Sequence, residues 1–309
     1  MFNLCYLIFA HNNISFLAET IKMLKGEGIS FYIHIDVKCN EDISPLKKLN
    51  SVNIIDDRFD IKWGGYAMID ALLHLCSAAL ADPQHFDYFI FLSGECVPLK
   101  SSGYIKEYIL NHNLENFIKA MPIPSEDCKW LEHGKRRLTS YPVFLPTRNI
   151  AMIEPRKLNY ANLRQIGKTL LNGDSKTILE MLKIWLFNPK RKSFPFQAYG
   201  GDFWWRMNRK SLETVISNYN DSLEFQIQMK QSPNPDEIAF VTLAYNFCSD
   251  INNSILTYVN WKGERSPERL TIKDSSLLLN LIKDPDTLFC RKINDSQVLD
   301  FIKVNLQEK

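Results

Sequence analysis

The sequence predicts an α/β fold in which a mainly parallel central sheet is flanked by helices. Apolar runs typical of buried strands alternate with amphipathic helical stretches along the first half of the chain. The run 2–10, the amphipathic stretch 15–25 and the run 31–36 form the first strand, helix, strand unit. Sheets of this kind bind ligands at the carboxyl ends of their strands, so we expect the functional residues there.

The later elements follow the same periodicity rules. Residues 68–80 predict a helix whose Leu, Ala and Ile side chains form a buried face. Further strands are expected at 52–55, 86–92 and 255–259, and further helices near 178–186 and from Pro235 onward. The segment 122–192 otherwise shows no clear pattern, and we expect loops there that could cover a cleft.

Composition limits the class of protein. A chain of 309 residues with 45% hydrophobic and 23% charged residues fits one large α/β domain or two tightly joined lobes. The formal net charge is only +2, and the basic residues are spread along the chain. We therefore expect no nucleic-acid partner.

Cysteines and the amino-terminal segment bear on location. The first apolar run lacks a basic leader and is too short to cross a bilayer, so we interpret it as a strand and not as a signal peptide. The seven cysteines are odd in number and include no CxxC pair. This pattern favours free thiols and a cytoplasmic location. The basic run 190–192 could contact an anionic membrane on its inner face, or could be a solvated loop.

Common catalytic motifs do not occur in the sequence. There is no GxGxxG after the first strand, no P-loop, no GxSxG and no HExxH. These absences argue against a dehydrogenase, an NTPase, a hydrolase and a zinc protease. The polar residues that follow expected strands are instead His11, Asp36, Trp63 and Ser93.

The segment 93–98 follows an interior strand, where a metal-binding motif would be expected if the site held a diphosphate through a metal ion. A divalent metal for this purpose usually needs an Asp-x-Asp, but the stretch Ser93, Gly94, Glu95 offers one carboxylate beside a thiol. We therefore expect no metal and no other cofactor. Arg291 and Lys292 could hold the phosphates instead, although two adjacent basic residues taken in isolation are more often a solvated strand end.

Two carboxylates could take a proton from a hydroxyl group. Glu237 follows Pro235 at an expected helix start, where acidic residues are also common because they complement the helix dipole. Asp202, next to two glycines and two tryptophans, is the rival. Trp204 and Trp205 could contact a sugar, but adjacent strand residues face opposite ways, so at most one should do so and the other should be core.

Taken together, these segments resemble the core-2/I-branching β-1,6-N-acetylglucosaminyltransferase family, which also includes the peptide O-xylosyltransferases. The resemblance covers most of the chain and rests on seven segments in register. They are 31–38, 63–65, 89–100, 200–205, 235–237, 258–261 with 266–267, and 288–292.

The resemblance implies a fold, a reaction and partners. It implies one GT-A-type nucleotide-sugar-binding domain over 1–309, with a nucleotide-binding half at 1–120 and an acceptor and catalytic half at 121–309. The implied reaction is an inverting, metal-independent transfer of N-acetylglucosamine from a UDP-sugar to a glycan hydroxyl. UDP-xylose, UDP-galactose or another UDP-sugar is the alternative donor. A catalytically silent nucleotide-sugar or glycan-binding module is the alternative of another class.

The resemblance also implies roles for single residues. Glu237 corresponds to the general base, Lys292 and Arg291 to the diphosphate-binding residues, and Asp36 to the residue beside uridine. His11, Trp63, Gly64, Ser93, Gly94 and Glu95 are carried over to the donor side, and Trp204 and Trp205 to the acceptor side. The branching enzymes use a further arginine upstream, for which Arg265 and Arg269 are the candidates here unless Arg291 suffices.

The chain departs from the animal relatives, which have membrane anchors and disulfides. We therefore expect a microbial member that builds a surface polysaccharide or a lipid-linked oligosaccharide from the cytoplasmic side, with possible peripheral membrane association.

Overall fold

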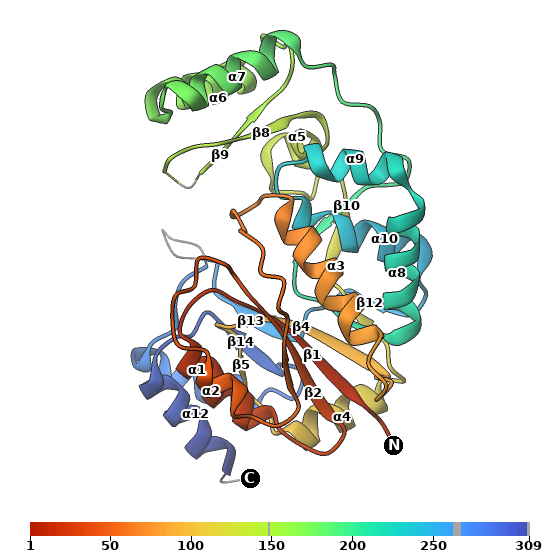
Figure 1. Cartoon of the computed structure of the whole chain (residues 1–309), viewed down its shortest axis with the longest axis vertical. Helices are drawn as coiled ribbons and strands as arrows, with labels where there is room; N and C mark the ends of the chain where they lie inside the picture. The colour runs from red at the N-terminus through yellow and green to blue at the C-terminus, as the bar shows by residue number, and fades with distance from the viewer. Residues whose placement is uncertain (148, 262–266, 308–309) are drawn as a thin grey trace.

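The computed structural model describes residues 1–147, 149–261 and 267–307 (Figure 1). Its main feature is a seven-stranded sheet with the order β12-β6-β11-β4-β1-β2-β3. Six strands run parallel, and β11 (Arg206–Asn208) is antiparallel to both of its neighbours. The mainly parallel α/β fold expected from the sequence is confirmed.

The centre of the sheet is made by β1 (Leu4–Ala10) between β2 (Ile29–Ile35) and β4 (Tyr88–Ser93). All seven residues of β1 are buried, because helices cover both faces of the sheet. Alternate side chains of β1 enter the two cores: Cys5, Leu7 and Phe9 pack into one, and the even-numbered residues pack into the other. The edge strands are β3 (Val52–Ile54) and β12 (Ile251–Asn252), and β6 (Asn116–Phe117) lies between β12 and β11.

Helices cover the sheet in two layers. One layer contains α1 (Ile14–Leu24), α2 (Ser44–Lys47) and α4 (Ser102–Asn111), whose apolar residues share a core. The other contains α3 (Ala67–Leu80), α8 (Arg209–Asp221), α9 (Leu223–Gln231) and α10 (Ala239–Phe247). Figure 1 shows α1 and α3 on opposite sides of the central strands.

A small sheet with the order β13-β14-β5 lies beside the first layer. It consists of β13 (Thr257–Val259), β14 (Phe289–Arg291) and β5 (Val97–Pro98), and it packs on α11 (Ser275–Lys283) and α12 (Ser296–Gln307). The remaining short elements are β7 (Ala120–Pro122), η1 (Leu131–Gly134), α5 (Lys135–Thr139), β10 (Tyr199–Gly201), η2 (Pro235–Glu237) and η3 (Ile272–Asp274).

The middle of the chain forms a separate arm at the top of Figure 1. It consists of the hairpin β8 (Tyr141–Phe144) and β9 (Ile150–Ile153) followed by α6 (Tyr160–Asn172) and α7 (Ser175–Phe187). Alternate hairpin residues pack with Met181 and Ile184 in a small core of their own. The arm begins and ends at nearly the same place, because the Tyr141 hydroxyl donates to the Pro189 carbonyl at 3.1 Å.

The element boundaries show where sequence patterns are weak. The helix expected near 178–186 is α7, whereas α6 was not predicted from the sequence. The strand expected at 255–259 is shorter, at Thr257–Val259. The prediction of a helix from Pro235 was wrong in detail, because Pro235–Glu237 is a 3-10 turn and α10 begins at Ala239.

Candidate active site

Polar residues after neighbouring parallel strands meet at one edge of the sheet. His11 follows β1, Asp36 follows β2, and Ser93 ends β4. The strand register places Phe9 opposite Ser93 and Ala10 opposite Ile35, so these strand ends are level with one another. The sequence analysis placed the site at this edge for the same reason.

Asp36 organises the segment that leaves β2. Its buried carboxylate accepts hydrogen bonds from the backbone amides of Lys38 at 2.8 Å and Ile61 at 3.2 Å. The Lys38 ammonium lies 3.1 Å from the same carboxylate. These contacts tie the segment before Trp63 to the strand end, and Trp63 is left 63% exposed beside the site.

Gly64 joins this segment to the turn that carries Glu237. Its φ of +66° lies in the left-handed region, and an added Cβ would lie 2.5 Å from Ile150 Cδ1 and 2.7 Å from Asn234 Nδ2. The Asn234 amide donates to the Gly64 carbonyl at 3.0 Å. The donor-side segment and the turn before Glu237 are therefore packed against each other.

Two basic side chains pair with Glu95, and a third, Arg291, lies near enough to Lys292 for its charge to affect the pKa of Lys292. Glu95 Oε1 lies 2.8 Å from Arg269, and its Oε2 lies 3.7 Å from Lys292. Glu95 is held there because its carbonyl accepts a hydrogen bond from the Ile293 amide at 3.0 Å. Burial lowers the pKa of Lys292, and the nearby charges of Arg291 and Arg269 act in the same direction while Glu95 opposes them. The cluster therefore has an excess of positive charge.

Arg291 completes this cationic cluster from the end of β14. Its guanidinium lies over the Trp204 ring at 4.3 Å from the centroid, and its Nε has no hydrogen-bond partner among the described residues. Trp204 thus lies with the cationic cluster. Trp205 stacks on Phe240 at 5.5 Å and is fully buried, so the assignment of Trp205 to the acceptor side is wrong. As expected for the pair, one of the two tryptophans belongs to the core.

Ser93, at the end of β4, and Gly94, which follows it, lie against the end of β1. An added Cβ at Gly94 would lie 3.6 Å from the Ala10 side chain, and the Gly94 amide donates to the Phe9 carbonyl at 2.8 Å. The Ser93 hydroxyl lies 3.3 Å from Cys96 Sγ. Within the described residues, no group of three His, Cys, Asp or Glu side chains is placed to hold a metal ion.

Glu237 forms an ion pair with Arg137, a different basic residue from those that pair with Glu95. Its Oε2 is 2.7 Å from the Arg137 guanidinium, and its side chain is 28% exposed. Burial raises the pKa of Glu237, Arg137 opposes this, and the charge of Asp202 raises the pKa further. Burial and the charge of Glu237 also raise the pKa of the adjacent Asp236.

Asp202 is the second carboxylate of the candidate site, and its pKa is affected by basic residues that include Arg291. Burial raises the pKa of Asp202, and the charges of Lys119, Arg291 and Arg206 lower it. The charge of Asp202 in turn raises the pKa of Glu237. Asp202 also lies two residues before Trp204, whose ring is under the Arg291 guanidinium.

Sequence reasoning missed Arg137 and left Arg269 as an alternative. The signal for Arg137 was the basic triplet 135–137, which lies in the segment without a clear pattern. Arg269 was one of two candidates for the upstream arginine, and it lies against Glu95 beside Lys292. The other candidate, Arg265, lies outside the described residues, as does Ser266.

A mainly parallel central sheet flanked by helices is consistent with the GT-A-type fold of glycosyltransferases. A family model for the core-2/I-branching enzymes matches residues 4–280. The chain therefore belongs to the core-2/I-branching enzyme family, which is a family of glycosyltransferases.

Individual relatives are distant. The chain is 21% identical over 254 residues to the xylosyltransferase oxt of Drosophila melanogaster; the match covers 79% of this chain but only 24% of that protein. A solved structure, 4-diphosphocytidyl-2C-methyl-D-erythritol synthase of Anaerococcus prevotii, matches with a TM-score of 0.32 at 12% identity, over 72% of this chain and 77% of that one. So low a TM-score establishes no shared fold.

Proposed function

We propose that this protein transfers a sugar from a UDP-sugar to a hydroxyl group of a glycan, with inversion at the anomeric carbon and without a metal ion. The observation that carries the proposal is the cationic group of Arg291, Lys292 and Arg269 around Glu95 and Trp204, together with a second, partly exposed carboxylate, Glu237, whose pKa is raised by burial. A cationic cluster and a candidate base form a site that could hold a diphosphate and an acceptor together.

The cationic cluster would receive the donor diphosphate. When the bond between the anomeric carbon and the phosphate oxygen breaks, the leaving UDP gains negative charge. Arg291, Lys292 and Arg269 offer charge-assisted hydrogen bonds to that charge. This is the role that a divalent cation would otherwise fill, which supports metal-independent transfer.

Glu237 would act as the general base. The acceptor oxygen forms a bond to the anomeric carbon as its proton passes to the Glu237 carboxylate, and the bonding electrons of the broken bond leave with UDP. A raised pKa makes a carboxylate a better proton acceptor near neutral pH. Arg137 opposes that rise and thereby keeps the carboxylate in the ionised form that a base requires.

The donor sugar that we propose is N-acetylglucosamine. UDP-xylose is the second candidate, because the relative in Drosophila melanogaster is named a xylosyltransferase. The acceptor would be a glycan or a lipid-linked oligosaccharide. We also propose a cytoplasmic location, which the seven free cysteines, six of them buried, support.

A panel of UDP-sugars tests the proposal. UDP-N-acetylglucosamine, UDP-xylose and UDP-galactose are each titrated calorimetrically, and UDP release is measured in parallel in the presence of EDTA. We expect one donor to bind and to release UDP with EDTA present. If a donor binds but UDP is not released, even when acceptor glycans are added, the result would favour a nucleotide-sugar-binding module without catalytic activity. Turnover that EDTA abolishes and manganese restores would contradict metal independence.

A further inference from the structure

Large apolar side chains are exposed along the two helices of the arm. Leu171 is 86% exposed, Phe187 is 76% exposed and Tyr160 is 80% exposed. The other exposed apolar residues on or next to these helices are Leu158, Leu163, Leu170, Leu179, Leu182 and Leu186. A surface of this kind on one structural unit is more than the scattered apolar residues that every protein exposes.

The exposed residues form stripes at helical spacing. On α7, Leu179, Leu182 and Leu186 follow one another at i, i+3 and i+7, so they lie on one face of the helix. The opposite face of α7 holds Met181 and Ile184, which pack against the β8 and β9 hairpin. The arm therefore has its core on one side and an uncovered apolar face on the other.

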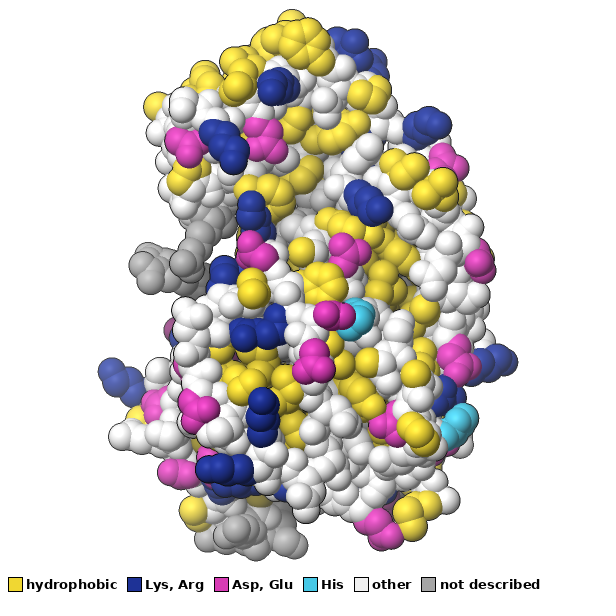
Figure 2. Space-filling model, in the orientation of Figure 1, with side chains coloured by type: hydrophobic (Ala, Val, Ile, Leu, Met, Phe, Trp, Pro, Cys, Tyr) yellow, Lys and Arg dark blue, Asp and Glu magenta, His cyan; other side chains and the backbone are white. Residues whose placement is uncertain are grey.

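Basic residues flank the apolar stripes. The helices α6 and α7 contain four Lys or Arg and one Glu, a formal net charge of +3. Arg164, Lys176 and Lys183 are exposed on the same two helices. Figure 2 shows hydrophobic side chains next to Lys and Arg side chains over the arm at the top of the molecule.

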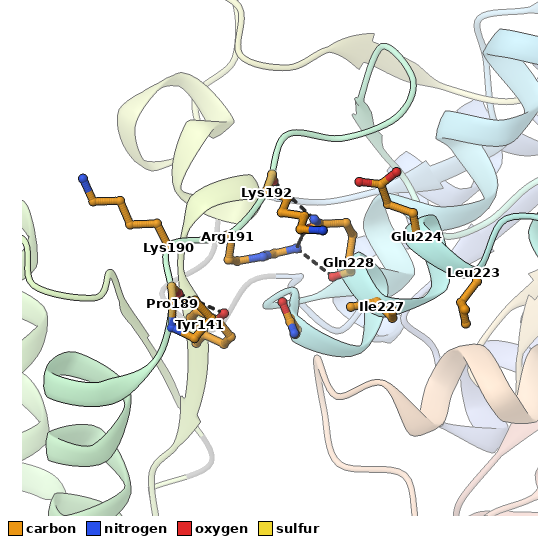
Figure 3. Close-up of a pocket in the computed structure, with 10 residues that line it drawn as sticks. Tyr141, Pro189, Lys190, Arg191, Lys192, Leu223, Glu224, Ile227 and Gln228 are labelled. Carbon is orange, nitrogen blue, oxygen red and sulfur yellow. Dashed lines mark hydrogen bonds between the residues drawn. The ribbon is translucent and has the colours of Figure 1, made fainter.

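The basic run 190–192 has another role at its centre. Arg191 donates hydrogen bonds to the carbonyls of Ser140 at 3.1 Å and of Gln228 at 2.7 Å, and to the Ser232 hydroxyl at 3.0 Å. Burial lowers its pKa to about 10. It forms one wall of a 360 Å³ cavity between the base of the arm and α9 (Figure 3). Arg191 thus braces the arm and is not available to a membrane.

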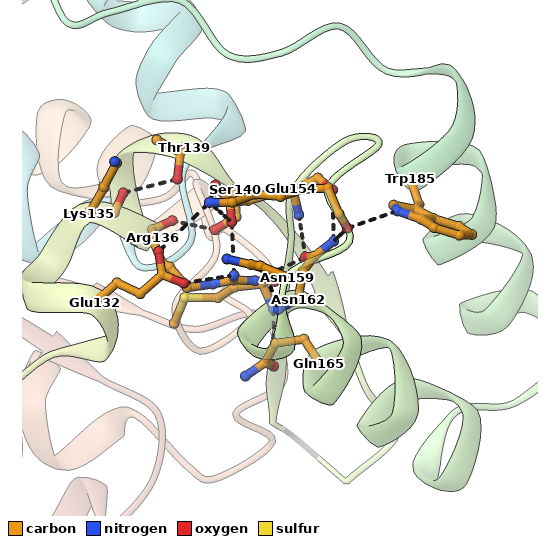
Figure 4. A network of polar contacts seen from close by, with 12 residues as sticks. Glu132, Lys135, Arg136, Thr139, Ser140, Glu154, Asn159, Asn162, Gln165 and Trp185 are labelled. Atoms are coloured by element: carbon orange, nitrogen blue, oxygen red, sulfur yellow. Dashed lines mark hydrogen bonds and ion pairs between the residues drawn. The ribbon is translucent and has the colours of Figure 1, made fainter.

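A second set of contacts fixes the arm to the body. Arg136, which is fully buried, donates to Glu154 at 2.9 Å and to Asn162 at 3.1 Å (Figure 4). The Asn162 side chain also accepts from the Glu154 amide at 2.8 Å. These contacts fix the start of α6 to α5, so the outer face of the arm is held in one orientation relative to the body.

We propose that the outer face of α6 and α7 docks on the surface of a membrane that contains anionic lipids. Helices that lie in a membrane interface combine an apolar stripe with flanking Lys and Arg, and the arm has both. A second copy of the chain is the poorer occupant. A two-fold contact through this face would bring the same basic residues of two copies together. Within the described residues, no helix is long and apolar enough to span a bilayer.

Vesicle flotation tests the proposal. The purified protein is mixed, without any donor sugar, with vesicles of phosphatidylcholine alone or of phosphatidylcholine and phosphatidylglycerol in equal parts. We expect flotation with the anionic vesicles only, and we expect it to weaken as salt is added. The variant Leu171→Ser/Phe187→Ser and the variant Lys176→Glu/Lys183→Glu should each reduce the binding constant by roughly tenfold or more.

Matched controls lie at the other end of the molecule. Leu110→Ser/Val304→Ser removes two exposed apolar side chains, and Lys47→Glu/Lys48→Glu reverses two exposed charges. Both should bind vesicles as the original chain does. Absence of flotation with anionic vesicles would overturn the proposal. Equal losses in controls and arm variants would do the same, as would a dimer that the leucine and phenylalanine variant dissociates. Because no sugar is present, these outcomes are independent of the proposed transferase activity.

Discussion

The guanidinium of Arg137 lies 2.7 Å from the carboxylate of Glu237, and the two residues come from opposite sides of the arm in sequence. Arg137 also lies over the Trp130 ring at 4.3 Å from its centroid, which fixes the guanidinium in place. This ion pair opposes the rise in the pKa of Glu237 that burial causes.

Replacing Glu237 with Gln should abolish transfer and leave the donor site intact. The substitution is nearly isosteric and removes only the proton acceptor, so we expect kcat to fall by ~100 to 10,000-fold. The dissociation constant of UDP, measured by calorimetry, should change little. Asp202→Asn is the comparison, because Asp202 lies in the same site. If Asp202→Asn lost activity while Glu237→Gln kept it, the base would be Asp202.

Replacing Arg137 with Met should move the acid limb of the pH profile of kcat to higher pH. Arg137 lowers the pKa of Glu237, so its removal lets that pKa rise, and the protonated, inactive form persists to higher pH. Arg137→Lys keeps a positive charge and should restore much of the original profile. A uniform loss of kcat at every pH, without a shift, would indicate that Arg137 acts in another way.

Replacing Lys292 with Ala should weaken UDP binding. The loss of a charge-assisted hydrogen bond costs about 1.5–3 kcal/mol, which is roughly 10 to 100-fold in the dissociation constant. In the original chain, the lowered pKa of Lys292 predicts that UDP binding weakens as pH rises through that value, because the ammonium loses its charge. Calorimetry across pH measures both effects, and an unchanged affinity in Lys292→Ala would remove this residue from the donor site.

Replacing Arg136 with Ala should destabilise the protein. Its removal takes one of two cationic partners from the buried Glu154 carboxylate and leaves Lys157 at 2.8 Å, so we expect a loss of about 1–3 kcal/mol, below the range for a buried charge left with no partner. Urea denaturation measures the change. Lys135→Ala, at the exposed neighbouring position, should change the unfolding free energy by about 0.5 kcal/mol or less. Similar losses in both variants would contradict a specific role of the Arg136 contacts.

The sequence was sufficient for the fold class and for the strand-end residues, because buried parallel strands leave unbroken apolar runs and their carboxyl ends meet at one edge. It was also sufficient to expect one of Trp204 and Trp205 in the core. Asp202, Glu237 and Arg291 were named individually, but their proximity depends on long-range packing that no local pattern records.

The arm was harder to predict for a physical reason. Residues 160–172 are amphipathic, but the positions of α6 that face the protein include the buried polar residues Asn162 and Thr169, while Leu163, Leu170 and Leu171 are exposed. Arg136 and Arg137 are adjacent in sequence, yet one is fully buried against Glu154 and the other pairs with Glu237. Two neighbouring basic residues with different environments cannot be separated from sequence composition.

The contact between Tyr141 and Pro189 has a consequence for engineering. The chain leaves the body and returns to it at nearly one point, so the body spans the same short gap whatever lies between these residues. A segment exchanged at this point would have to keep the contacts that Glu154 and Asn162 make with Arg136. With those contacts kept, the arm is the natural unit to exchange in a chimaera.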